Sequence, residues 1–184
     1  MRLLSLAGLV MVLAACASRD ASPVRTYDLG VEIPKTQLPA LRAVTVRAPM
    51  PYDSVEMYYR LAWRDAAEIA PFANSRWAAP PAELVRRQIV RALPGSAGGA
   101  CALDVELQDF SQRFSAPEAS EARIELRAAL LTPQGRVAAQ SFRIAESGGG
   151  ANAASGSGAF ARAAERALDE ISGWIAKQPA CAGP

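Results

Sequence analysis

The chain has 184 residues, of which 51% are hydrophobic and 21% charged, and these values are typical of a folded domain with a sizeable core. Its formal net charge of +2 gives no indication of nucleic-acid binding. It contains no histidine, which excludes Ser-His-Asp and Cys-His catalysis, histidine-ligated zinc and pH sensing through an imidazole.

The first 16 residues have the pattern of an exported, acylated protein. Arg2 is followed by an apolar run over residues 3–13, which is shorter than the roughly 20 residues that span a bilayer but matches the core of a signal peptide. Leu13-Ala14-Ala15-Cys16 resembles the lipobox of bacterial lipoproteins. We therefore predict a signal peptide over residues 1–15 and acylation of Cys16, with a plain secretory signal and a chance cysteine as the alternative.

Residues 16–24 predict a lipidated N-terminus and a flexible tether, because they are small and polar. Two or three acyl chains on Cys16 give stable membrane anchoring. The residue after the cysteine is Ala17 and not aspartate. By resemblance to other bacterial lipoproteins, an alanine at this position permits sorting to the outer membrane. The predicted location is the outer membrane, with the domain facing the periplasm.

A folded domain is predicted over residues 25–178, and it begins with strands. Alternating or aromatic runs indicate strands at 25–30, 41–48 and 57–63, with a weaker one at 66–72. Residues 74–81 read as the approach to a helix in which Leu84, Ile89 and Leu93 recur at helical spacing. Pro94-Gly95 ends this helix.

The second half of the domain predicts a three-stranded antiparallel meander and a final helix. Its strands are expected at 102–114, 122–131 and 136–145, and a Gly, Ala and Ser-rich run at 147–158 is expected to be a mobile loop. An apolar stripe indicates a helix over 158–177, followed by a C-terminal tail at 179–184. The resulting fold class is α+β, a single domain with two helices packed on one face of a mostly antiparallel sheet.

The first predicted strand of the meander carries three carboxylates. Asp104, Glu106 and Asp109 include two on one strand face, which could chelate calcium or act as an acid/base pair. A solvated face, with Arg123 and Arg127 as cross-strand partners, is the favoured interpretation.

Other chemistry is not indicated. Gly156-Ser157-Gly158 precedes a helix but lacks the lysine and spacing of a P-loop, so it is interpreted as a linker. No serine has a lysine or carboxylate at the spacing expected of a hydrolase. We expect no enzyme activity, no cofactor and no metal site.

Two cysteines remain once Cys16 is acylated. The oxidising periplasm favours a disulfide between Cys101 and Cys181, which would attach the C-terminal tail to the start of a central strand. Two separate thiols are the alternative, because the sequence does not give the Cα separation that bonding requires.

Aromatic residues are concentrated in one third of the domain, and Tyr and Trp are favoured at protein contacts. We take Tyr58, Tyr59, Arg76 and Trp77 as candidate partner-binding residues. Aromatic residues on strands are usually core, however, and a core position for Trp77 is the alternative.

Several motifs together resemble the ABC-type transport auxiliary lipoproteins, the PqiC/YmbA-like family. They are the lipobox, Tyr27-Asp28-Leu29, Tyr58-Tyr59-Arg60-Leu61, Asn74-Ser75-Arg76-Trp77-Ala78-Ala79-Pro80-Pro81, Leu103-Asp104-Val105-Glu106-Leu107-Gln108-Asp109-Phe110 and the late helix with Trp174. The resemblance covers nearly the whole mature chain.

This resemblance implies a non-catalytic accessory of an MCE-type system that moves lipids between the inner and outer membranes. The implied partners are an MCE-domain protein and the ABC permease and ATPase, and family members can form homo-oligomeric rings. The alternative is a lipoprotein that activates or helps to assemble a cell-envelope complex such as a peptidoglycan synthase.

Overall fold

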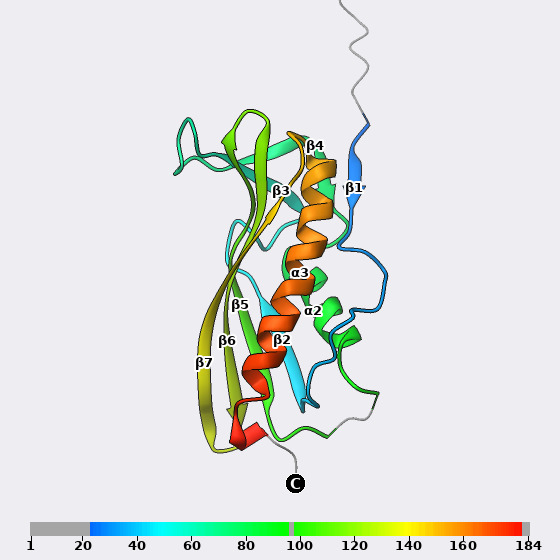
Figure 1. Cartoon of the computed structure of the whole chain (residues 1–184), viewed down its shortest axis with the longest axis vertical. Coiled ribbons are helices and arrows are strands. Elements are labelled where there is room, and N and C mark those ends of the chain that lie inside the picture. The colour runs from blue at the N-terminus through cyan, green and yellow to red at the C-terminus, as the bar shows by residue number, and fades with distance from the viewer. Residues whose placement is uncertain (1–22, 96–97, 182–184) are drawn as a thin grey trace, which may run out of the picture.

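The computed structural model describes residues 23–95 and 98–181. The predicted signal peptide, Cys16 and most of the predicted tether lie outside the described residues. The domain is an elongated α+β structure in which one sheet carries both α-helices on the same face (Figure 1). The class and the single-face arrangement of the helices agree with the expectation from the sequence.

The sheet has seven strands, and their order in the chain is interrupted once by a helix before the meander. The elements are β1 (Arg25–Tyr27), β2 (Ala43–Arg47), β3 (Glu56–Leu61), β4 (Ala70–Trp77), α2 (Pro81–Arg91), β5 (Ala102–Ala116), β6 (Ala119–Thr132), β7 (Gly135–Ser147), α3 (Ala153–Ile175) and a 3-10 turn at Pro179–Cys181.

The sheet is mixed, so the prediction of a mostly antiparallel sheet was partly wrong. The β5–β6–β7 meander is antiparallel, as predicted. On its other edge β5 pairs in parallel with both β2 and β3, and β1 pairs in parallel with β4. Parallel strands need a long connection that carries the chain back to the end of the sheet where the first strand began. The segment that contains β4 and α2 provides this connection, so that β5 can run in the same direction as β2 and β3.

A bulge in β5 changes which residues face the helices. Leu103, Val105 and Leu107 are buried in alternation, and the register with β6 then shifts between Leu107 and Asp109. Phe110 and Phe114 continue the buried face after the shift. The extra residue in the bulged strand therefore keeps Asp109 on the same face as Glu106, away from the helices.

The core lies between the sheet and the two helices. Val85 and Ile89 of α2 and Leu168 of α3 converge on Ile124 and Leu126 of β6. The helix predicted to follow residues 74–81 and to end before Pro94-Gly95 is confirmed as α2. It starts at Pro81, and proline is tolerated there because the N–H that it lacks would have no partner in the first turn of a helix.

Two sequence expectations around the helices were wrong. Residues 74–77 lie in β4 rather than in an approach to α2. The run at 147–158 is not a loop throughout, because α3 already begins at Ala153. The Asn152 side chain accepts a 2.9 Å hydrogen bond from the Ser155 N–H and caps this helix.

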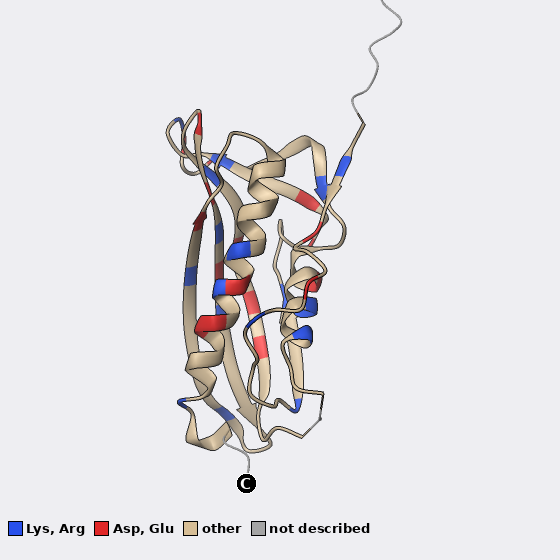
Figure 2. Cartoon of the chain, turned by 45° about the vertical axis from the view of Figure 1, so that its right-hand side comes forward, with Lys and Arg blue, Asp and Glu red and all other residues tan. Residues whose placement is uncertain are grey.

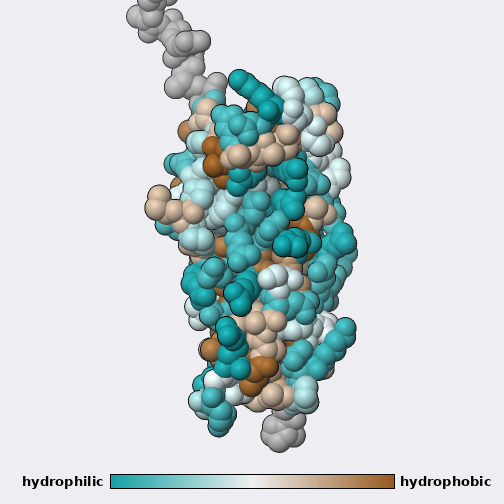
Figure 3. Space-filling view, turned by 90° about the vertical axis from the view of Figure 1, so that its left-hand side faces the viewer, coloured by the Kyte–Doolittle hydropathy of each residue, from teal (hydrophilic) through white to brown (hydrophobic). Residues whose placement is uncertain are grey.

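The face of the sheet opposite the helices is charged and solvated, as predicted for Asp104 and Glu106. Their partner is not the predicted one. Arg47 of the neighbouring parallel strand contacts both carboxylates, whereas Arg123 pairs with Glu125 of its own strand. Acidic and basic residues are interspersed over the molecule, and the side along β7 is predominantly hydrophilic (Figures 2 and 3).

Candidate functional site

An aromatic groove lies at the end of the molecule where the described chain begins. Tyr59 of β3 packs against Phe72 of β4 and Phe114 of β5, with ring centroids 4.7 and 6.1 Å apart. The groove has a volume of about 370 Å³. Its lining residues are Tyr59, Leu61, Trp63, Phe72, Ala73, Phe114, Pro117 and Ala151.

Trp63 is the most exposed aromatic side chain of this groove. It lies in the connection between β3 and β4 and is 51% exposed. Trp77 and Trp174 are only 2% and 7% exposed. A large apolar side chain left in water on a groove rim indicates a contact surface, because its burial by a partner would release unfavourable hydration.

Trp77, one of the predicted partner-binding residues, belongs to the core instead. Its ring packs edge-on against Phe110 and Phe160 at 5.4 and 5.2 Å, and those two rings stack at 4.4 Å. Within the described part of the chain, its indole nitrogen has no hydrogen-bond partner. The alternation of β4 turns Trp77 inward between the sheet and α3, so it is unavailable to a partner.

The other three predicted contact residues do not form one site. Tyr58 is half-buried and packs edge-on against Tyr52, with ring centroids 5.9 Å apart. Tyr59 is half-buried in the groove, and Arg76 is exposed on β4. Neighbouring residues of one strand point to opposite faces, which separates Tyr58 from Tyr59.

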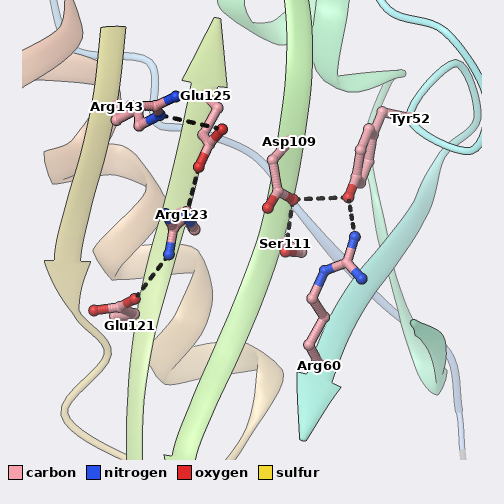
Figure 4. Close-up of polar contacts among 8 residues, drawn as sticks. All are labelled: Tyr52, Arg60, Asp109, Ser111, Glu121, Arg123, Glu125 and Arg143. Carbon is pink, nitrogen blue, oxygen red and sulfur yellow. Dashed lines mark hydrogen bonds and ion pairs between the residues drawn. The ribbon is translucent and has the colours of Figure 1, made fainter. Parts of the chain in front are cut away.

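A polar network that the sequence did not predict lies on the open face of the sheet (Figure 4). The Tyr52 hydroxyl donates a 2.7 Å hydrogen bond to Asp109, which accepts another of 2.7 Å from Ser111. Arg60 donates to the Tyr52 hydroxyl at 3.3 Å. Burial, reinforced by the hydrogen bond to Asp109, raises the pKa of Tyr52 to about 12.

This network fills a gap in the pairing of β5. Residues 102–106 of β5 pair with β2 and residues 111–114 pair with β3, so the stretch around the bulge has no strand on that edge. The loop between β2 and β3 places Tyr52 there, and it is 3% exposed. A tyrosine after Pro49-Met50-Pro51 was the available signal, but only the fold brings it to Asp109.

A second charged cluster lies beside this network on β6 and β7. Arg123 contacts Glu125 at 2.9 Å and Glu121 at 3.8 Å, and Arg143 contacts Glu125 at 3.7 Å. These side chains are partly or largely exposed, so each pair contributes at most about 1 kcal/mol. In residues 23–95 and 98–181, no group of three or more acidic, cysteine or histidine residues is arranged to bind a metal ion.

The opposite end of the domain contains a disulfide. Cys101 at the start of β5 is bonded to Cys181 in the 3-10 turn, with their Cα atoms 5.2 Å apart. Because β5 is extended over 15 residues, the disulfide lies roughly 45 Å from the aromatic groove at the other end of this strand. No helix in the described residues is long and apolar enough to cross a membrane.

Comparisons with solved structures support the fold. The chain is 21% identical to protein XCC0632 from Xanthomonas campestris, assigned to DUF330, with a TM-score of 0.69 and coverage of 82% of this chain and 94% of that one. An uncharacterized protein of known crystal structure is 13% identical, with a TM-score of 0.65 and coverage of 84% and 99%. No curated protein shows significant similarity to the chain.

The comparison with family models gives the family. The model of the ABC-type transport auxiliary lipoprotein component matches residues 31–176. This range includes α2, α3 and every described strand except β1. The two similar crystal structures share the fold at low sequence identity. The chain therefore belongs to the family of ABC-type transport auxiliary lipoprotein components.

Proposed function

We propose that the protein is a docking component of an MCE-type ABC transport system that moves lipids between the inner and outer membranes. The match of the transport auxiliary family over residues 31–176 is the observation that carries this proposal. An accessory of a transporter must bind its partners but need not perform chemistry. Energy from ATP is supplied by the partner ATPase in the inner membrane.

In this proposal Cys16 carries the acyl chains and anchors the protein in the outer membrane, facing the periplasm. The MCE-domain protein would approach from the inner membrane with its hydrophobic cargo, and the folded domain would bind it. Self-association into a ring would surround the site at which cargo is delivered. The lipobox residues 13–16 support the anchor.

A strap across the two helices is the proposed docking surface. Residues 29–38 contact α3 through a 3.2 Å hydrogen bond from the Lys35 N–H to Glu165 and a hydrogen bond from Thr36 to Asp169. Val31 and Ile33 of this strap are each 80% exposed. Apolar side chains that are exposed to water on a segment held against a helix are typical of a protein contact.

Arg76 also stays a proposed contact residue. Its side chain is exposed, and among the described residues it takes part in no ion pair. A free guanidinium suits an acidic group on a partner.

Purification from membranes tests this function. The tagged full chain, crosslinked in cells and purified from the envelope, should recover an MCE-domain protein with the permease and ATPase. The double variant Val31→Asp with Ile33→Asp should reduce this recovery at least tenfold. Val137→Asp is the matched control, because Val137 is 43% exposed on β7, away from the strap, and the variant should retain recovery.

Two results would contradict the proposal. One is repeated recovery of a peptidoglycan synthase alone, which would favour an activator of cell-wall synthesis. The other is recovery of no transporter subunit from cells that produce the protein in its acylated form.

A further inference from the structure

The chain enters the folded domain beside the aromatic groove. Ala73 and Ala151 line the groove, and their neighbours Asn74 and Asn152 line a second depression together with Pro23, the first described residue. Figure 1 shows the beginning of β1, the β5–β6 turn and the start of α3 at the same end of the molecule. The groove and the N-terminal attachment point are therefore close together.

The sequence limits how far this end can lie from the anchor. Six residues, 17–22, lie between Cys16 and Pro23, so Pro23 is seven residue steps from Cys16. A fully extended chain of that length spans at most about 25 Å. With Cys16 acylated, the groove end is within this reach of the bilayer, whereas the disulfide lies roughly 45 Å farther along β5.

The groove has the chemistry of the membrane interface. Trp63 is 51% exposed on its rim, and Tyr59 is half-buried within it. Trp and Tyr are enriched where headgroups meet acyl chains, since each has an apolar ring and a polar atom. The chain between Cys16 and Pro23 is an unsuitable occupant, because Ser18, Arg19 and Asp20 are polar.

We propose that this aromatic groove rests in the interfacial region of the phospholipid bilayer that holds the acyl chains of Cys16. The inference depends on the anchoring in the proposed function and adds an orientation to it. The long axis of β5 then stands away from the membrane. The strap with Val31 and Ile33 lies along the side of the domain, open to a partner in the periplasm.

The attraction is mainly apolar. Arg64 follows Trp63 and suits a lipid phosphate, but Asp65 and Glu68 of the same connection offset its charge. An electrostatic contact would weaken with added salt, whereas burial of aromatic surface would not. Membrane contact of Trp63 should therefore persist in high salt and in vesicles without anionic lipid.

Tryptophan fluorescence of the full acylated chain tests the proposal. The protein is reconstituted into phosphatidylethanolamine and phosphatidylglycerol vesicles, with or without brominated acyl chains, which quench nearby tryptophan. Trp77 and Trp174 are buried, so Trp63 is the exposed reporter among the three tryptophans. Membrane contact should shift the emission maximum to the blue, and brominated lipid should reduce the emission intensity. Both effects should be absent from Trp63→Phe.

A matched control places the reporter at the other end. Val137 lies near the β6–β7 turn, at the same end as the disulfide, and is 43% exposed (Figure 1). In the Trp63→Phe background, the tryptophan fluorescence introduced by Val137→Trp should be quenched by acrylamide dissolved in the water and not by brominated lipid. Circular dichroism of each variant confirms the native fold.

The outcomes separate this inference from the proposed function. Acylated protein that floats with vesicles while Trp63 stays accessible to acrylamide and unaffected by brominated lipid would overturn the inference and leave the anchor intact. A change in Trp63 emission that needs the co-reconstituted transporter would assign the groove to a protein and also overturn it. Protein that carries no acyl chains and does not float would overturn the anchoring on which both depend.

Discussion

Replacement of Trp77 by alanine tests whether this residue supports the fold. Trp77 is 2% exposed and packs against Phe110 and Phe160. Truncation of a buried Trp or Phe to alanine commonly costs about 3–5 kcal/mol of unfolding free energy, from lost transfer energy and the cavity left behind. For a domain of this size, the loss corresponds to a fall in melting temperature of roughly 6–20 °C.

The Trp77→Phe variant sharpens this prediction. It keeps an aromatic ring in the cluster and removes an indole N–H that has no hydrogen-bond partner in the described structure. We expect a loss of less than about 1.5 kcal/mol, since relief of the unpaired donor offsets part of the lost volume. Trp63→Ala, at a 51% exposed position, should change stability by no more than about 0.5 kcal/mol.

Urea unfolding followed by circular dichroism measures these values in the unacylated Cys16→Ser background. A Trp77→Ala variant within about 1 kcal/mol of the parent protein would refute the core assignment. A Trp77→Phe variant as unstable as Trp77→Ala would refute the cost assigned to the indole N–H.

Three further predictions concern stability. Reduction of Cys101–Cys181, which closes a loop of 80 residues, should lower unfolding free energy by about 2–5 kcal/mol in urea titrations, and no loss would contradict the constraint. The folded-state pKa of Tyr52 is about 12, above its ordinary value of 10.0, so the stability it contributes is present below pH 10 and should be lost as pH rises from 10 to 12. Tyr52→Phe should remove this part of the loss of stability at alkaline pH, which is measured as the melting temperature against pH. An alkaline profile unchanged by Tyr52→Phe would contradict the contribution assigned to Tyr52. Gly156→Ala should destabilise the domain by about 1–3 kcal/mol, because the added Cβ would lie 2.1 Å from the amide oxygen of buried Gln112. Gly173→Ala, where the added Cβ meets open space, should stabilise the domain by up to about 1 kcal/mol. Equal effects of the two substitutions in urea titrations would contradict the close contact at Gly156.

The regular elements were predictable because their apolar periodicity matches their burial. Leu103, Val105 and Leu107 alternate in the sequence, and the same residues are buried in the structure. The stripe of α3, including Phe160 and Ile171, was equally clear. The local sequence pattern predicts these elements because each of them buries one apolar face in the same core.

Other features depend on contacts between distant parts of the chain. The parallel pairing of β2 and β3 on one edge of β5 leaves no local signal, and the bulge that keeps Asp109 facing Tyr52 has none either. The start of α3 lies in a run that reads as a loop, because its burial against Gln112 favours small residues. The exposed Trp63 and the buried Trp77 look alike in sequence, and tertiary packing alone distinguishes them.

Both the docking role and the orientation at the membrane require the N-terminal anchor. Mass analysis of the N-terminal peptide, from protein isolated in the outer-membrane fraction, tests this requirement most directly. We predict that Cys16 is the first residue of the mature protein and carries a diacylglycerol on its sulfur. A free thiol at Cys16, still preceded by residues 1–15, would contradict it.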